Sequence, residues 1–178
     1  MPEDLGGPFQ LLLDIAARAR RGGDDGLTKA HPDWTGVGFS LLGQRFVAPM
    51  TEVTEILIPP SVSRLPRVKS WVRGVANVRG RLMPVVDLAT FFDGRPTPNW
   101  KGHRALVLDV GELYVGLVVD EVHGLKHFAA EAFRGPIDGL SERMLAFTDG
   151  AYAGPEGNWV IFSAERLVSD PQFLDAAV

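Results

Sequence analysis

The sequence contains no cysteine among its 178 residues. This absence excludes disulfide bonds, thiol catalysis, iron–sulfur clusters and zinc held by thiolates. Positive charge is in the minority, because 18 Lys and Arg residues stand against 22 Asp and Glu residues, for a formal net charge of −4. Proteins that bind nucleic acid or anionic membranes usually carry an excess or a strong patch of positive charge. We therefore expect neither as a partner of the whole chain.

Long hydrophobic runs are missing as well. The apolar stretch Leu113–Val119 is among the longest, and it is far shorter than the ~20 residues that a membrane helix requires. Residues 1–4 lack the positive charge with which a signal peptide begins, and Asp14 interrupts the apolar run at 11–15. We expect a cytoplasmic protein that does not insert into the membrane.

Common catalytic motifs are absent too. The chain has no Gly-x-Ser-x-Gly, no phosphate-binding Walker loop and no His-Glu-x-x-His. His123 and His127 have the spacing of two metal ligands on a helix, but no third ligand accompanies them. Carboxylates at predicted strand ends could form acid–base pairs, although such residues more often cap turns; they are Asp87, Asp109, Asp120 and Glu121. We expect no catalysis, no cofactor and no metal, and keep a β-barrel enzyme or metal-binding protein as an alternative.

What the sequence does contain begins with a short helical pattern. Apolar residues recur at helical spacing over residues 8–21, and the glycine-rich residues 22–26 predict a flexible link. We assign residues 1–38 to an N-terminal extension and residues 39–178 to one β-rich domain. The helix of the extension could pack on its own domain or bind a partner.

From residue 39 onward the pattern is typical of strands. We predict strands over residues 39–42, 46–50, 53–58, 82–88, 104–110, 113–119 and 159–162. Pro84 should restrict its strand to a sheet edge or a bulge. Two helices are expected, one that starts after Pro66 and ends before Gly74, and one near residues 164–168.

An internal repeat divides the strand-rich region. Residues 43–48 resemble residues 111–116, and each half closes with an apolar strand, at 85–88 and at 160–162. Two copies of a unit of about five short strands predict paired β-barrels. Chance similarity between two short hairpins is the alternative.

One segment, residues 64–81, is basic throughout. It has no acidic residue, and its basic residues are Arg64, Arg67, Lys69, Arg73, Arg79 and Arg81. In an acidic chain this asymmetry indicates a solvated face, a surface for an acidic or phosphorylated partner, or a binder of single-stranded nucleic acid. Within it, Asn77-Val78-Arg79-Gly80 predicts a tight turn with Arg79 at its tip. Its guanidinium would bind a partner carboxylate or hold the two barrels together through backbone carbonyls.

The same segment carries a family resemblance. Residues 71–88 read Trp-Val-Arg-Gly-Val-Ala-Asn-Val-Arg-Gly-Arg-Leu-Met-Pro-Val-Val-Asp-Leu. They resemble the signature of CheW-type chemotaxis coupling proteins, Gly-x-x-Asn-x-Arg-Gly followed by apolar residues around a proline and Asp-Leu. A second family signal is similar to residues 116–122, Gly-Leu-Val-Val-Asp-Glu-Val. The chain start at residues 8–12 and its last six residues resemble the branch that serves type IV pilus twitching-motility systems.

This resemblance implies a mostly β, CheW-like fold of two five-stranded SH3-like barrels packed together with short helices. It implies a non-catalytic scaffold, associated with membrane receptor arrays, that links the cytoplasmic tip of a methyl-accepting chemoreceptor to the regulatory domain of a CheA-type histidine kinase. By position, the receptor-binding groove maps onto Val53, Glu55, Gly74, Arg79 and Leu82. The kinase-binding patch maps onto Ile56, Leu57, Ile58 and Val62.

Overall fold

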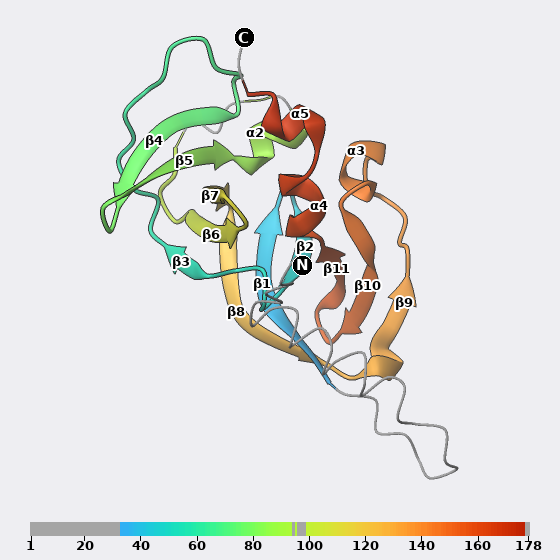
Figure 1. Ribbon diagram of the computed structural model, residues 1–178. Coiled ribbons are helices and arrows are strands. Elements are labelled where there is room, and N and C mark those ends of the chain that lie inside the picture. Colours follow the sequence, from blue (N-terminus) through green and yellow to red (C-terminus); the bar gives the residue numbers. More distant parts are fainter. Residues whose placement is uncertain (1–32, 94, 96–98, 177–178) are drawn as a thin grey trace, which may run out of the picture.

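A computed structural model describes residues 33–93, 95 and 99–176 (Figure 1). The extension's predicted helix and link, residues 8–26, lie outside these residues. The strands are β1 (Trp34–Leu41), β2 (Gln44–Pro49), β3 (Glu55–Leu57), β4 (Val72–Val78), β5 (Arg81–Asp87), β6 (Arg104–Val110), β7 (Leu113–Val119), β8 (Glu121–Phe128), β9 (Phe133–Gly135), β10 (Thr148–Gly154) and β11 (Gly157–Phe162). The helices are α2 (Leu88–Asp93), the 3₁₀ turn η1 (Ala130–Ala132), α3 (Glu142–Leu145), α4 (Ala164–Val168) and α5 (Pro171–Leu174).

The strands form two sheets. One has six strands in the order β8-β1-β2-β11-β10-β9, and the other has five in the order β3-β6-β7-β5-β4. The prediction of a mostly β fold with two strand-rich units and short helices is confirmed. One sheet exceeds the expected five strands because the three-residue strand β9 pairs with the outer side of β10.

The two sequence repeats exchange strands between the sheets. The hairpin β1–β2 of the first repeat pairs with β8 and β11 of the second. In the same way, the hairpin β6–β7 of the second repeat pairs with β3 and β5 of the first. In both sheets the second strand of the hairpin forms a parallel pair with a strand of the other repeat. These pairs are β2 with β11 and β7 with β5. The repeat seen in the sequence therefore corresponds to a structural repeat, and each sheet contains both halves of the chain.

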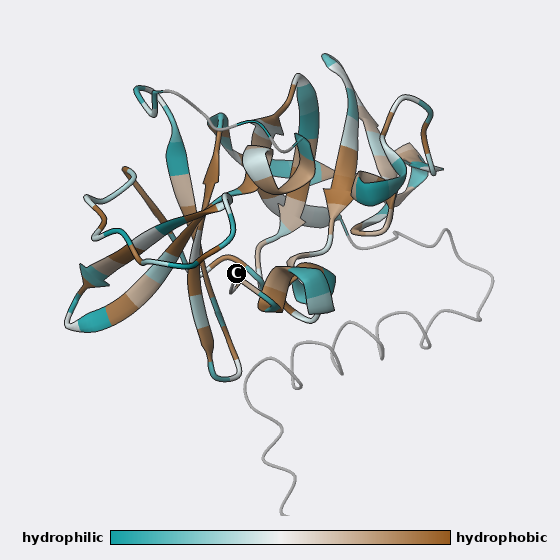
Figure 2. Ribbon diagram, turned by 90° about the horizontal axis from the view of Figure 1, so that it is seen from above, coloured by the Kyte–Doolittle hydropathy of each residue, from teal (hydrophilic) through white to brown (hydrophobic). Residues whose placement is uncertain are grey.

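Alternation along the strands divides the core into three clusters. On β5, Val86 belongs to the main cluster, to which both sheets and the helices contribute, whereas Val85 belongs to a smaller cluster on the other face of its sheet. On β2, Phe46 belongs to the main cluster and Val47 to a third, aromatic-rich one. Period-2 side-chain alternation produces this division. Figure 2 shows hydrophobic residues along the strands and hydrophilic residues at several turns.

The helix predicted over residues 66–73 is wrong. The structure has an irregular segment there, and strand β4 begins already at Val72. Arg67 has φ = +56°, which a right-handed helix excludes. The backbone N–H of Lys69 donates to the carbonyl oxygen of Ala176 at 2.8 Å. Contacts with distant parts of the chain therefore override the local helical spacing.

Pro84 also departs from its prediction, because β5 lies between β7 and β4 and not at an edge. Parallel pairing with β7 starts at Val85, so the missing N–H of Pro84 falls just before that pairing begins. An irregularity in the register does occur, in the neighbouring strand β4 between Val72 and Gly74.

Other elements follow the sequence closely. Strands β6 and β7 and helix α4 have the predicted bounds. The first predicted strand begins earlier, at Trp34. Strands β4, β8, β9 and β10 were not predicted, since glycines or polar residues interrupt their apolar pattern. Within the described ranges, no helix is long and apolar enough to cross a membrane.

Candidate functional site

A two-residue turn joins β4 to β5 and carries Arg79 at its tip. Val78 and Arg81 pair on either side of the turn. The φ angles are +53° at Arg79 and +79° at Gly80, the pattern of a type I′ turn. The backbone N–H of Gly80 donates to Oδ1 of Asn77 at 3.0 Å. The predicted tight turn is confirmed, and these contacts fix where Arg79 leaves the backbone.

The guanidinium of Arg79 pairs with a carboxylate from the opposite edge of the sheet. Its Nη2 lies 2.6 Å from Oε1 of Glu55. Glu55 is on β3 and the turn follows β4, and these are the two outer strands of the five-stranded sheet. The Arg79 side chain is 75% exposed and that of Glu55 22%. The ion pair therefore orients the arginine while leaving most of its head group in solvent.

A second arginine is held more tightly beside the first. Nη1 of Arg81 lies 2.8 Å from Oδ2 of Asp109. Its guanidinium also lies 3.9 Å from the ring centroid of Tyr114, a cation–π contact. The hydrogen bond that Arg81 donates to the carboxylate of Asp109 raises the pKa of Arg81 above its usual range. Arg81 thus remains charged and spans from β5 across β7 to β6.

Strands β3 and β5, which carry Glu55 and Arg81, also carry exposed aliphatic side chains. Leu82 is 70% exposed, next to Arg81 on β5. Ile56 and Ile58 are 40% and 75% exposed, on and just after β3. Leu57 and Val62 instead pack against the smaller core cluster of this sheet. Strand alternation therefore divides the predicted kinase patch into two outward and two inward residues.

Two residues expected in the receptor groove have structural roles. Gly74 is buried and has φ = +144°. A Cβ atom there would collide with the carbonyl oxygen of Ser63, whose backbone pairs with Val75. Val53 packs against the main core cluster. Of the five receptor positions, the structure brings Glu55 and Arg79 into contact, with Leu82 exposed on the same hairpin.

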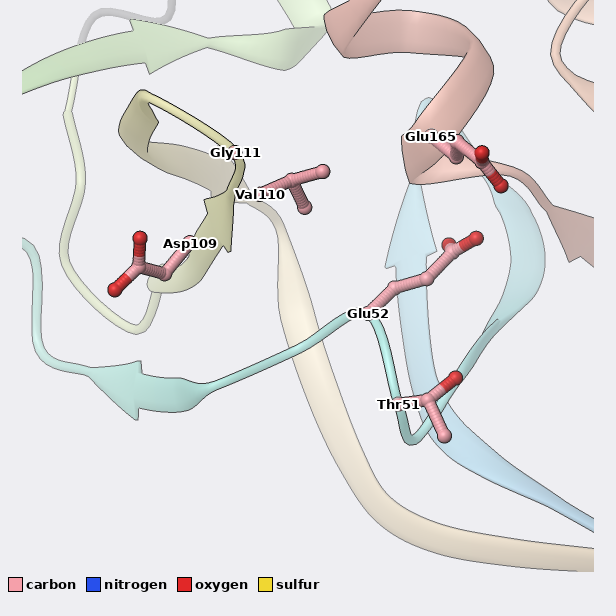
Figure 3. A pocket seen from close by; sticks show the side chains of 6 residues that line it. All are labelled: Thr51, Glu52, Asp109, Val110, Gly111 and Glu165. Carbon is pink, nitrogen blue, oxygen red and sulfur yellow. The ribbon is translucent and has the colours of Figure 1, made fainter. Parts of the chain in front are cut away.

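A pocket of about 230 Å³ lies where the β2–β3 and β6–β7 connections approach α4. Its lining residues are Thr51, Glu52, Asp109, Val110, Gly111 and Glu165. Figure 3 shows Glu52 extending toward the start of α4, where Glu165 lies. Oε2 of Glu52 accepts a hydrogen bond from the N–H of Ala164 at 2.8 Å. Burial raises the pKa of Glu52, against the opposing effect of the backbone hydrogen bonds. The pocket thus contains a carboxylate that joins two parts of the fold.

With this geometry in view, comparison with known proteins gives the family. The CheW-like domain model matches residues 35–172. The chain belongs to the CheW-like family.

Named relatives agree with this membership. The chain is 42% identical over 177 residues to Protein PilI of Pseudomonas aeruginosa, covering 98% of this chain and 99% of that protein. It is 25% identical over 134 residues to Chemotaxis protein CheW of Klebsiella aerogenes, covering 75% and 81%. Among solved structures, the scaffolding protein TtCheW of Thermoanaerobacter tengcongensis matches with a TM-score of 0.64 and 22% identity, covering 74% of this chain and 90% of that one. This last likeness supports the fold.

The candidate acid–base residues of this CheW-like domain have separate partners. Buried Asp87 precedes α2 and accepts a hydrogen bond from the N–H of Thr90 at 3.3 Å. Asp120 accepts one from the N–H of Leu42 at 2.9 Å. Asp109 pairs with Arg81, and Glu121 is exposed on β8. Asp87 and Asp120 therefore accept backbone hydrogen bonds, as the turn-capping interpretation predicts, whereas Asp109 forms an ion pair and Glu121 faces solvent.

The two histidines lie on strand β8 of the CheW-like domain, not on a helix. Nε2 of His123 is 2.6 Å from the hydroxyl of Ser40, and Nδ1 of His127 is 2.8 Å from that of Thr35. Both hydroxyls belong to β1, which pairs with β8. In the part of the chain that the structure describes, no group of His, Asp and Glu is arranged to hold a metal ion.

The role of Glu52 was not predicted from the sequence. A Glu-Val pair does recur in the second half of the chain, at Glu121-Val122, but the partner of Glu52 at α4 lies 112 residues away. Such a pairing becomes visible only after the chain has folded.

Proposed function

We propose that this chain is a non-catalytic adaptor that couples the cytoplasmic tip of a membrane chemoreceptor to the regulatory domain of a CheA-type histidine kinase. We further propose that it acts at receptor arrays of a chemosensory system that controls type IV pili and twitching motility. The similarity to Protein PilI over nearly the full length of both chains supports the pilus assignment. Membership of the CheW-like family supports the adaptor role.

The proposed receptor surface centres on Arg79. The observation that carries it is a mostly exposed guanidinium on a rigid turn, oriented by Glu55, with exposed Leu82 on the same hairpin. A receptor helix could place its apolar face on Leu82 and a carboxylate on Arg79, which is the helix-in-groove mode of recognition. Arginine is enriched among the residues that dominate interface energies.

The proposed kinase surface is the outward face of β3 and the residue after it. Ile56 and Ile58 expose aliphatic surface there, while Leu57 and Val62 anchor the segment from below. Glu55 of the receptor surface precedes Ile56 of the kinase surface on this strand, and strand alternation points the two side chains to opposite faces of the sheet. A short strand shared by both surfaces supports coupling, because a state-dependent contact at one shifts the binding equilibrium at the other.

The test uses Arg79→Ala in the full chain with purified receptor-tip and kinase regulatory domains. We expect the free energy of unfolding to stay within about 0.5 kcal/mol, since the ion pair is exposed. Receptor affinity should fall by roughly 2 kcal/mol or more, as for an interface anchor. Kinase affinity should change far less. Calorimetric titration and thermal unfolding measure all three quantities.

Two further variants make the test specific. Arg134→Ala removes an exposed arginine from β9 and should leave both affinities unchanged. Ile56→Asp with Ile58→Asp should weaken kinase binding and spare receptor binding. Full receptor affinity in a folded Arg79→Ala protein would contradict the receptor surface. Parallel loss of stability and both affinities would favour a structural role for Arg79.

A further inference from the structure

The connection between β3 and β4, residues 58–71, has no helix or regular strand, yet its backbone is held in place. Ser63 and Val75 exchange two backbone hydrogen bonds of 2.8 and 2.9 Å. Lys69 N–H donates to the carbonyl oxygen of Ala176 at 2.8 Å. Figure 1 shows this segment arching along the outside of β4 toward the C-terminal end. Long connections of this kind in compact domains are usually functional.

The charge on this connection is of one sign. Residues 58–73 contain no acidic residue and four basic ones, namely Arg64, Arg67, Lys69 and Arg73. Among the described residues, none of these four forms an ion pair, whereas Arg79 and Arg81 of the neighbouring hairpin both do. The positive charge of residues 64–73 is therefore uncompensated in a chain whose net charge is −4.

The backbone at Arg67 adds an independent indication. Arg67 follows Pro66 in a turn and has φ = +56°. A proline followed by a residue with positive φ is the pattern of a type II turn, in which glycine or asparagine is preferred at the second position. Arginine stands there instead and is exposed. Strained non-glycine positions cluster at functional sites, where the surrounding structure maintains them.

This basic surface contains a hollow of about 220 Å³. It is lined by Arg64, Leu65, Ser70, Val72 and Arg73. Two guanidinium groups suit bidentate contact with carboxylates, and Leu65, 41% exposed, offers apolar contact. Together they suit a peptide in which acidic residues flank an aliphatic one.

The aromatic residues near the hollow are poorly placed for nucleic acid. Trp71 packs edge-on against Phe91, with ring centroids 5.3 Å apart, and its Nε1 is buried. The ring of Trp100 is occupied by Arg73, whose guanidinium lies 5.2 Å from the centroid. Binding of single strands relies on exposed rings on which bases stack. The geometry favours an acidic polypeptide over a nucleic acid.

We propose that the basic surface of the β3–β4 loop and the start of β4, formed by Arg64, Arg67 and Lys69 of the loop and Arg73 of β4, is a docking surface for an acidic, aliphatic-containing segment of a partner protein. It is separate from the receptor surface at Arg79. The carboxylate partner of Arg79 is Glu55 of the same chain, whereas the four basic residues have no such partner among residues 33–93, 95 and 99–176. Through it the domain binds a further acidic segment while its receptor and kinase surfaces stay available.

The test measures binding of a labelled peptide that alternates Glu-Glu with Leu to the full chain, by fluorescence anisotropy. Arg64→Glu with Arg67→Glu should weaken binding by about tenfold or more, because like charges then face the peptide. Arg45→Glu with Arg134→Glu reverses the same number of exposed charges on the six-stranded sheet and should leave the affinity within about twofold. Arg79→Ala should also bind the peptide normally, which separates this proposal from the receptor surface.

Circular dichroism checks folding, and Arg64→Gln with Arg67→Gln provides a milder second variant. A thymidine oligonucleotide and phosphatidylserine vesicles serve as competing probes. Equal loss of peptide binding in the control variant would show a nonspecific charge effect and overturn the proposal. Unchanged binding in both loop variants would overturn it too, as would tighter loop-dependent binding of the oligonucleotide or the vesicles than of the peptide.

Discussion

Leu42, Arg67 and Arg79 have left-handed backbone conformations although none of them is glycine, with φ values of +51°, +56° and +53°. Such positions cost about 1–3 kcal/mol each and persist only where their surroundings hold them. Asn77 supports the turn at Arg79, and Asp120 accepts the N–H of Leu42. At the residue scale, strain is maintained by nearby carboxylate or amide side chains at two of the three sites.

Asp120 should contribute to the free energy of unfolding through its contacts within the fold. Asp120→Ala removes the acceptor for Leu42, and the contact with His103, at 3.4 Å, disappears with it. We expect the free energy of unfolding to fall by about 1–2 kcal/mol, toward the low end for a hydrogen bond to a charged group because the Asp120 side chain is 37% exposed. Urea unfolding measures this change.

Asp120→Asn is the matched control, because its amide oxygen can still accept the N–H of Leu42. It should retain most of the stability. An unchanged midpoint in Asp120→Ala, together with lost partner binding, would mean that Asp120 acts at an interface and not within the fold.

At the element scale, each repeat ends with a strand followed by a short helix whose N-terminus is capped by a side chain. Asp87 caps α2 after β5, and Ser163 caps α4 after β11, each through its side-chain oxygen. The N–H groups of both residues also donate to distant carbonyls, of Trp71 and Phe147, at 2.8 Å. The capping acceptor is a carboxylate in the first repeat and a hydroxyl in the second. In both repeats it accepts the backbone N–H three residues further along the chain.

Glu52 connects the β2–β3 turn to α4 and should make stability depend on pH. Burial raises its folded pKa above the ordinary value of 4.5. The folded protein then holds the proton more tightly than the unfolded chain. The contribution of this group is most favourable below the unfolded pKa and is lost as the pH rises through the folded pKa.

Glu52→Gln should therefore become increasingly stabilising, relative to the natural residue, as the pH rises above about 4.5. The amide is neutral throughout, and its oxygen can still accept the N–H of Ala164. Urea unfolding of both proteins across the range measures the difference. A difference that stays constant, or shrinks with rising pH, would contradict the burial explanation.

At the scale of the whole molecule, strand exchange makes the two halves interdependent. Four pairings join one repeat to the other, namely β1–β8, β2–β11, β3–β6 and β5–β7. Without them each half retains hairpins, which are marginally stable alone in water. The main core also takes residues from both halves.

We therefore expect a chain divided between α2 and β6 to give two fragments that do not fold separately. Mixed in equal amounts, they should form a 1:1 β-rich complex with one cooperative melting transition. Circular dichroism and size-exclusion chromatography measure both outcomes. The undivided chain is the control, and native-like structure in either fragment alone would contradict the interdependence.

Much of the fold follows from local pattern. Continuous apolar runs on either side of Gly111-Glu112 predicted β6 and β7 with the right ends, and the tight turn was predicted from residues 77–80. The prediction for residues 66–73 failed because helical spacing of a few apolar residues is weak against pairing of Ser63 with Val75. Of the candidate site, the exposed Arg79 was predictable; its partner Glu55 was not, because the two meet only when the sheet's outer strands approach each other.

The mostly β class, the repeat, the hairpins and the family could all be predicted before the fold was known, because apolar patterning, turn chemistry and motif spacing act between residues close in the chain. The pairing of the strands could not, and the strand exchange, the link from Glu52 to α4 and the pairing of Arg79 with Glu55 all depend on it. These depend on hydrogen bonds and packing between segments tens of residues apart. The free energy of such contacts comes from the closed sheets and the shared core, which no single stretch of sequence contains.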